Sequence, residues 1–256
     1  MRKLLTGLSV LAALAIASSS HAATGTVDMT WTSCTGTADV TSATPAVFNI
    51  FVSVIGFDQP HQAYETTFIY GDATGGVQDA WRFDPNGCQG ISSLGTISHL
   101  APGSVSKVCP SFQGALQSVQ VKAIDFVPPS DTGSGYLLTN MRCTLFNAYP
   151  NGNPPAGSPN FNPAVRYFLM EASFDHSFSI QGPTVDPAVA CGGWAAPVCF
   201  KLARASYLDL SGNEIPFGRN VNGAGQLIAT FNGGAACTAV PARAATWGSI
   251  KSQYRN

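Results

Sequence analysis

The dominant pattern of the chain is a long alternation of apolar and polar residues. From position 168 to position 180 the even positions are Phe168, Met170, Ala172, Phe174, His176, Phe178 and Ile180, whereas most odd positions are polar. Successive side chains of a β-strand point to opposite faces of the sheet, so this period of two predicts a strand with one buried face. Strands usually contain about five or six residues, so the length also predicts a bulge or a crossing between sheets.

The same stretch contains Asp175, His176 and Ser177 in succession, the three residue types of a hydrolase triad. A triad requires a histidine that is hydrogen-bonded to both other members. In a strand, Asp175 and Ser177 share the polar face and His176 points to the other side, among phenylalanines. We therefore predict His176 to be a core histidine whose ring nitrogens find a backbone or hydroxyl partner.

Further segments show strand patterns and are separated by turns rich in Gly, Pro and Asn. They are residues 46–57, 63–70, 117–127, 135–146, 206–217 and 225–231. Residues 46–57 are partly apolar on both faces, which predicts a central strand, and residues 206–217 are predicted to form a hairpin. Helical periodicity is almost absent. The pattern predicts an all-β fold, a β-sandwich or jelly roll with long loops.

The C-terminus is the exception to the strand pattern. Trp247, Ile250 and Tyr254 share one face of a short predicted helix, and Lys251 and Arg255 suit the negative end of its dipole. This helix is expected to pack on the sandwich. The alternative is a docking tail that another protein recognises.

The N-terminus predicts export. Residues 1–22 combine two basic residues, an apolar stretch and small residues before a cleavage site after Ala22, as a secretory signal peptide does. The apolar stretch is shorter than the ~20 residues that span a bilayer, so no stable membrane span is expected after cleavage. The mature chain, residues 23–256, is predicted to be one sandwich domain, with a possible internal boundary in the proline-rich segment 147–164.

The charge balance excludes one class of partner. Charged residues make up 11% of the chain, and the 14 acidic residues outnumber the 13 basic ones. No basic block is present to neutralise phosphates, so nucleic-acid binding is not expected.

Seven cysteines lie in the exported part, where disulfides are the default expectation. The local pairs Cys88–Cys109 and Cys191–Cys199 are predicted, since each would clamp a loop rich in Gly and Pro. One further bridge then remains for Cys34, Cys143 and Cys237, and the odd count leaves at least one thiol unpaired or bonded to another chain. No spacing typical of a cysteine or histidine metal site occurs.

Trp194 is the candidate ligand-binding residue. It lies in the loop between Cys191 and Cys199, next to glycines that cannot bury it locally. A fixed indole suits stacking on a sugar ring or insertion into a partner's pocket. The alternative is an indole folded back over a sheet edge, and Trp81 is predicted to belong to the core.

Calcium and carboxylate catalysis are the remaining chemistries. Two short segments cluster oxygen ligands around a glycine, as calcium loops do, although ordinary turns have the same composition. The candidate ligands are Asp84, Asn86, Asp209 and Glu214. No other cofactor is expected. Glycoside hydrolysis would need a carboxylate pair, for which Asp79, Asp84, Glu171 and Asp175 are conceivable members.

Two stretches, "AWRFDPNGCQG" (80–90) and "TWGSIKSQYR" (246–255), resemble segments of uncharacterised secreted bacterial proteins that are rich in β-strands and contain cysteines. The resemblance implies a bacterial, exported origin and carries no activity. In outline the chain is also similar to sandwich modules of adhesion and carbohydrate-binding proteins.

Together these features predict a secreted, non-catalytic module that binds a glycan or an extracellular protein. One alternative is a structural subunit of an envelope or extracellular assembly. The other is a glycan-active hydrolase that uses a carboxylate pair.

Overall fold

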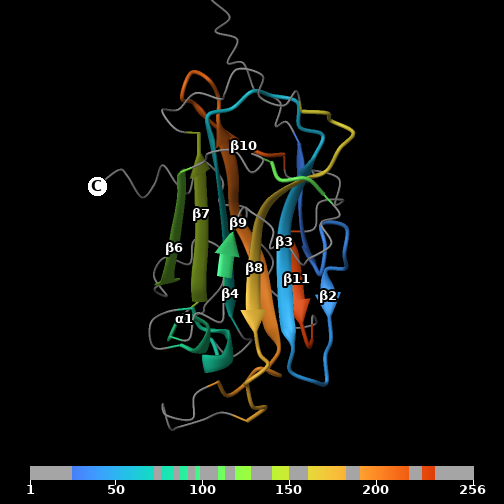
Figure 1. Cartoon of the computed structure of the whole chain (residues 1–256), viewed down its shortest axis with the longest axis vertical. Helices are drawn as coiled ribbons and strands as arrows, with labels where there is room; N and C mark the ends of the chain where they lie inside the picture. The colour runs from blue at the N-terminus through green and yellow to red at the C-terminus, as the bar shows by residue number, and fades with distance from the viewer. Residues whose placement is uncertain are drawn as a thin grey trace, which may run out of the picture.

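The computed structural model describes residues 25–71, 76–83, 87–91, 96–98, 109–112, 119–127, 140–149, 161–182, 191–218 and 227–233. Within them two β-sheets pack face to face, which confirms the predicted all-β sandwich (Figure 1). The predicted signal peptide and C-terminal helix lie outside the described residues.

The smaller sheet has four antiparallel strands in the order β1-β3-β8-β5. Their bounds are Thr26–Trp31 for β1, Val47–Ile55 for β3, Tyr167–Asp175 for β8 and Thr96–Ser98 for β5. The prediction that residues 46–57 form a central strand is correct, because β3 pairs with β1 on one side and with β8 on the other.

The larger sheet has the order β2-β11-β9-β4-β7-β6, and β10 also pairs with β9. Its strands are β2 (Asp39–Val40), β11 (Ile228–Phe231), β9 (Val198–Leu208), β4 (Ala63–Gly71), β7 (Asn140–Ala148), β6 (Val119–Val127) and β10 (Glu214–Pro216). β9 and β10 form the predicted hairpin. Both sheets contain strands from before and after the segment 147–164.

An aromatic layer fills the space between the sheets. The ring of Phe200 on β9 contacts Trp31 on β1 at 5.1 Å and stacks on Tyr70 of β4 at 4.8 Å between centroids. Phe174 of β8 reaches across from the smaller sheet to Tyr70 at 5.6 Å. These side chains are fully buried. Edge-to-face and offset aromatic pairs stabilise such a layer beyond the burial of area alone.

A bulge in β8 changes which residues of the alternating stretch face the core. Val52 of β3 pairs with Met170 and Ser53 pairs with Phe168, so Leu169 has no opposite residue. The predicted bulge is therefore present. As a result Phe168 lies in a separate cluster with Phe51, away from the main core to which Met170 belongs.

The C-terminal end of the alternating stretch differs from the prediction. β8 ends at Asp175, and a turn follows. Phe178 and Ile180 are therefore 74% and 46% exposed, although the alternation placed them on the buried face. Asp and Ser side chains that bond to nearby backbone N–H groups favour turns over strands.

The cluster around Phe168 is covered by a disulfide on the outer face of the smaller sheet. Cys34, which follows β1, is bonded to Cys109, with 6.2 Å between their Cα atoms. Next to Cys109, the chain bonds to the bulged part of β8, since the Phe168 N–H donates to the Pro110 carbonyl at 2.8 Å. Cys34, Cys109, Phe51 and Phe168 form this second core.

Both predicted disulfide pairs are wrong. Cys88 is bonded to Cys191, across 103 residues of sequence, and Cys109 is bonded to Cys34. Cys199 is also disulfide-bonded, to a cysteine outside the described residues, whereas Cys143 is a buried thiol. Cysteines that are close in sequence here lie on different strands and loops, so tertiary contacts decide the pairing. Disulfides of this kind fit an exported protein.

Peptide mapping under non-reducing conditions is expected to recover Cys34 linked to Cys109 and Cys88 linked to Cys191. Since these pairs and Cys143 leave only Cys237 in the sequence, a Cys199–Cys237 peptide is expected as well. Recovery of Cys88 linked to Cys109 in the folded, unreduced protein would contradict this arrangement.

Candidate functional site

The residues after β8 form a tight turn at the lower end of the sandwich in Figure 1. The Asp175 carboxylate accepts the Ser177 N–H at 2.9 Å, and the His176 carbonyl accepts the Ser179 N–H at 2.9 Å. Phe178 lies between these two bonds with its side chain in solvent. The Asp-His-Ser sequence is thus a turn that displays a phenylalanine, and it is not a triad.

The buried side chain of His176 anchors this turn to the core. Its ring is fully buried, lies 4.3 Å from the Trp81 ring centroid, and is parallel to the ring of Phe174 at 6.4 Å. Nδ1 lies 3.4 Å from the Ser179 hydroxyl, the kind of partner predicted, but Nε2 has no hydrogen-bond partner among the described residues. Burial lowers the pKa of His176 to about 4. The core-histidine prediction is confirmed.

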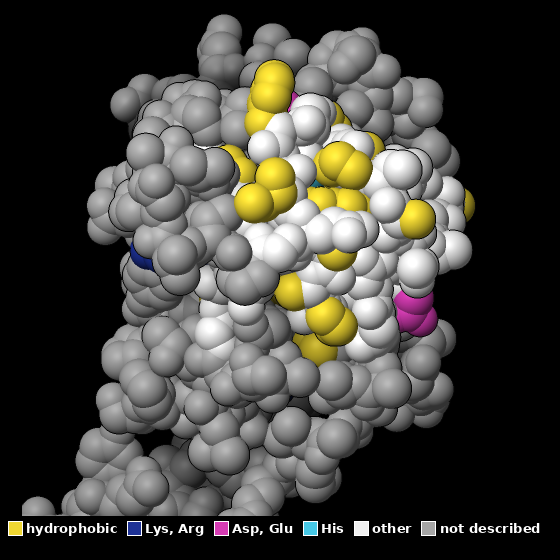
Figure 2. All heavy atoms as spheres, turned by 90° about the horizontal axis from the view of Figure 1, so that it is seen from below, with side chains coloured by type: hydrophobic (Ala, Val, Ile, Leu, Met, Phe, Trp, Pro, Cys, Tyr) yellow, Lys and Arg dark blue, Asp and Glu magenta, His cyan; other side chains and the backbone are white. Residues whose placement is uncertain are grey.

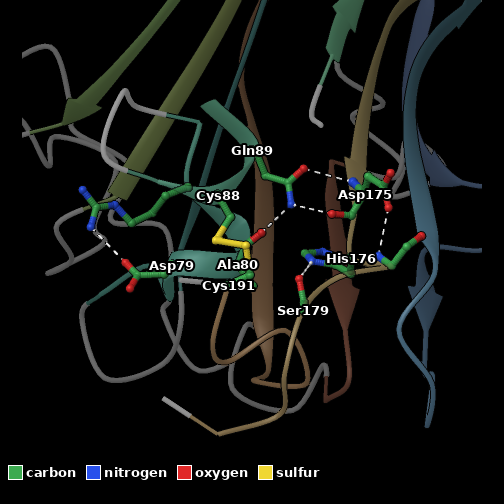
Figure 3. Close-up of a disulfide and its surroundings, with 10 residues drawn as sticks. Asp79, Ala80, Cys88, Gln89, Asp175, His176, Ser179 and Cys191 are labelled. Carbon is green, nitrogen blue, oxygen red and sulfur yellow. Dashed lines mark hydrogen bonds and ion pairs between the residues drawn. A yellow bond between two sulfur atoms is a disulfide. The ribbon is translucent and has the colours of Figure 1, made fainter. Parts of the chain in front are cut away.

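A buried glutamine joins the end of β8 to the neighbouring helical segment (Figure 3). Gln89 lies on α1 (Cys88–Ile91), and its Oε1 accepts the Asp175 N–H at 3.0 Å while its Nε2 donates to the Asp175 carbonyl at 3.0 Å. Nε2 also donates to the carbonyl of Ala80, on the 3₁₀ turn η1 (Asp79–Trp81), at 2.6 Å. The side-chain amide thus takes the place of a neighbouring strand. No pattern in the sequence singled out this residue.

The Cys88–Cys191 disulfide ties α1 to the loop beyond the turn, with 5.3 Å between the Cα atoms. That loop pairs with the residues after Phe178, because the Ile180 N–H donates to the Cys191 carbonyl at 2.9 Å and the Gly193 N–H donates to the Ile180 carbonyl at 3.0 Å. Gly193 has a φ of +81°, and a Cβ there would lie 2.8 Å from Gln78. Glycine is required at this contact.

Three exposed apolar side chains lie on the segments that meet here, and we call Val47, Phe178 and Ile180 the Phe178 platform. Val47 is 50% exposed and pairs with Asp175, and the adjacent Ala46 carbonyl accepts the His176 N–H at 3.0 Å. Seen from this end, the described part of the surface is mostly apolar and uncharged polar (Figure 2). Among the described residues one other large apolar side chain is as exposed, Leu210 in the turn between β9 and β10.

Asn232, which follows β11, holds two of the supporting loops in place. Its Oδ1 accepts the Ser42 N–H at 2.8 Å, and its Nδ2 donates to the Ala195 carbonyl at 3.2 Å. The loop before β3 and the loop that contains Trp194 are therefore fixed to the same strand end.

The predicted ligand-binding role of Trp194 is wrong. Its side chain is 1% exposed and its ring lies 6.4 Å from that of Phe231. The Trp194 carbonyl accepts the indole N–H of Trp81 at 3.1 Å. The alternative, an indole folded back onto the sheet, is the one observed, because the loop closes over the end of the aromatic layer. Trp81 is in the core, as predicted.

Two of the predicted calcium ligands, Asp209 and Glu214, lie among the described residues. One stabilises a turn and the other forms an ion pair. The Asp209 carboxylate accepts the N–H groups of Ser211 and Asn213, both at 2.8 Å. Glu214 instead bonds to Arg204 at 2.6 Å. No group of three or more His, Cys, Asp or Glu suited to a metal occurs among the described residues. Asp84, Asn86 and the predicted docking residues Trp247, Ile250, Lys251, Tyr254 and Arg255 lie outside them.

The conceivable catalytic acids do not converge. Asp79 is paired with Arg82 at 3.0 Å. Glu171 and Asp175 both lie on β8, and four residues of a strand span about 13 Å, more than the 5–9.5 Å between glycosidase carboxylates. The fourth candidate, Asp84, is not described.

One carboxylate pair was not predicted. Arg204 lies between Glu65 and Glu214, at 3.3 Å and 2.6 Å from their oxygens. The hydrogen bond from Arg204 lowers the pKa of Glu214, the opposite of what a general acid needs. The hollow beside these groups holds about 50 Å³, whereas ligand pockets hold roughly 300–1,000 Å³.

Neither a protein-family model nor a curated protein sequence matches the chain. The structure overlaps solved cohesin modules. One, from a family 33 glycoside hydrolase of Clostridium perfringens, has a TM-score of 0.35 and 10% identity over 82% of this chain and 98% of that chain. A type II cohesin domain from the cellulosome of Acetivibrio cellulolyticus has a TM-score of 0.39 and 9% identity over 82% and 95%. A non-cellulosomal cohesin from Archaeoglobus fulgidus has a TM-score of 0.33 and 8% identity over 80% and 89%. Scores and identities this low identify neither a family nor a partner.

Within the described part of the chain, no helix has the length and apolar character needed to cross a bilayer.

Replacing Phe178 with Ala is expected to change the free energy of unfolding by less than about 0.5 kcal/mol, because an exposed ring contributes little to folding. Phe174→Ala is the matched control, and loss of this buried ring is expected to cost roughly 3–5 kcal/mol. Denaturant unfolding measures both. A loss above about 2 kcal/mol for Phe178→Ala would show that the chain itself covers this ring.

Stability is expected to fall in mild acid. His61 is also buried, among Phe57, Phe112 and Phe161, and burial lowers its pKa to about 3. Unfolding returns both histidines to an ordinary pKa of about 6.5, so below that pH the unfolded chain binds more protons than the folded chain. Each histidine then lowers the free energy of unfolding by up to about 1.4 kcal/mol per pH unit between pH 6.5 and its folded pKa.

Urea unfolding at pH 7 and pH 5 tests this, with His61→Phe and His176→Phe as variants. Each variant is expected to lose about half as much stability between the two pH values as the unsubstituted protein. Equal losses in all three proteins would assign the acid sensitivity to other groups.

Proposed function

We propose that the protein is an exported, non-catalytic module that binds an extracellular protein through the Phe178 platform. The observation that carries the proposal is the 74% exposure of Phe178 on a turn whose backbone and supporting side chains are fixed. Apolar side chains that gather on one surface mark interaction sites, whereas isolated ones do not, and here three lie on adjoining segments.

A protein partner is favoured over a glycan by the placement of the aromatic residues. Every Trp and Tyr side chain among the described residues is buried, including Trp194. Indole and phenol rings combine an apolar face with a polar group, which suits the mixed apolar and hydroxyl surface of a sugar. The exposed ring at this site is a phenylalanine, which has no polar group and suits an apolar pocket in a protein.

A catalytic role finds no support in the described acids. Glu171 and Asp175 are too far apart, and the Glu65–Glu214 pair is bridged by an arginine. The alternative, a structural subunit of an assembly, also requires a protein partner. It differs from a binding module in that the contact with the partner is permanent.

A photo-crosslinker at Gln181 tests the proposal. Gln181 is exposed, three residues from Phe178, so a benzoylphenylalanine there leaves the platform intact. The matched control carries the crosslinker at Leu210, which is 52% exposed in a turn at the other end of the sandwich (Figure 1). Both proteins are added to the culture medium and cell envelopes of the producing organism and then irradiated.

A protein adduct is expected from position 181 and not from position 210. Adducts with polysaccharide alone would favour the glycan-binding alternative, and an absence of adducts beyond the control would remove the platform as a binding site. An adduct that stays assembled through purification without irradiation would favour the structural subunit.

A further inference from the structure

We infer that the partner receives the Phe178 side chain in an apolar pocket free of charged groups, so that the association is driven by desolvation and depends little on salt. This inference rests on the proposed function and names the chemistry of the partner. It follows from the charge, the rigidity and the size of the Phe178 platform.

Four described segments carry or directly support the platform, and they contain no charged residue, whereas the nearby Asp79 and Arg82 of the η1 region are paired with each other. Residues 42–47, 176–182, 191–197 and 227–233 include no Lys, Arg, Asp or Glu. His176 is neutral near pH 7, because its pKa is about 4. Asp175 borders the platform, and its carboxylate already accepts the Ser177 N–H. A charged group of the partner that lines the pocket around the Phe178 ring would be desolvated against an apolar side chain, which is costly even with Asp175 at the border.

The platform is ordered before any partner arrives. The turn carries two local hydrogen bonds, His176 is packed under Trp81, and Ile180 is paired with the loop that the Cys88–Cys191 disulfide holds. The three exposed side chains remain to be fixed, and Phe178, the largest of them, has two rotatable bonds. Preorganisation of this kind reduces the entropy lost on binding, so one aromatic ring can act as an anchor.

The size of the platform favours a pocket over a flat contact. Three side chains provide far less than the roughly 800 Å² that each partner of a standard interface buries. Two copies of this chain that met only through their platforms would thus bury too little area for a stable dimer. A pocket that encloses Phe178 removes the largest apolar area of the ring from water. The exposed Ser177 and Gln181 would then lie at the rim of the contact, where polar interactions are usual.

The inference is tested by measuring the dissociation constant between this protein and the partner identified by the crosslink at position 181. Phe178→Ala is expected to weaken binding by roughly 30-fold or more, as loss of a buried anchor does. Ile180→Ala, at the edge of the pocket, is expected to weaken it by about 3- to 10-fold. Leu210→Ala is the matched control for an exposed apolar residue elsewhere and is expected to stay within about twofold. Between 50 and 500 mM NaCl, the dissociation constant of the unsubstituted protein is expected to change by less than about threefold.

The other outcomes separate the two proposals. If the crosslinked protein binds more than about tenfold weaker in high salt while Phe178→Ala still weakens binding, the pocket chemistry is wrong and the proposed function stands. If Phe178→Ala binds within about threefold of the unsubstituted protein, both the inference and the platform as the binding site are wrong. If no protein is crosslinked, both fail. Flotation with phosphatidylcholine vesicles that Phe178→Ala abolishes would assign the platform to a lipid surface, and self-association that Phe178→Ala abolishes would assign it to a second copy. Either result would overturn the inference.

Discussion

The lower end of the molecule depends on the burial of Trp81. Its indole contacts Phe174, Phe200 and Phe231 at 5.1, 5.8 and 4.8 Å between centroids, and His176 at 4.3 Å. All three polar groups of this residue are paired. The indole N–H donates to the Trp194 carbonyl, the backbone N–H donates to the Gln78 carbonyl at 2.8 Å, and the backbone carbonyl accepts the Tyr70 hydroxyl at 2.6 Å. One side chain from a short 3₁₀ turn thus joins both sheets to the loops beyond them. Without it, the aromatic layer would end at a gap and the loops would lose their common support.

The same packing explains why an apolar residue can remain in solvent at this end. Trp194 packs on Phe231 and His176 packs on Trp81 in the aromatic layer, and the residues next to them form turns that cover the layer. In the turn after β8, His176 packs beside Trp81 and Phe178 lies on the solvent side. The exposure of Phe178 follows from how the sandwich closes, and the proposed binding role uses a surface that this closure provides.

Most of the strands were predictable because their residues interact with near neighbours in a regular way. The patterns of β3, β4, β6 and the β9–β10 hairpin indicated their places, and the excessive length of the alternation in β8 indicated its bulge. The short strands β2 and β5 are too brief to show a period and were missed. The strand β1 and residues 198–205 of β9 were not predicted either. The turn after β8 could have been found from Asp175 and Ser177, which compete with strand hydrogen bonds, but the period of two continued through it and concealed it.

The sequence by itself determined the all-β class and the burial of His176 and Trp81, and it contains no block of basic residues. These features depend on local periodicity and composition, which any strand expresses wherever it pairs. Only the tertiary structure decided the disulfide partners, the burial of Trp194, the role of Gln89 and the exposure of Phe178. Cys88 and Cys191 are 103 residues apart, and Gln89 meets Asp175 from a different segment. Contacts between segments so distant in the chain depend on how two sheets close over a shared core, and no local pattern records that.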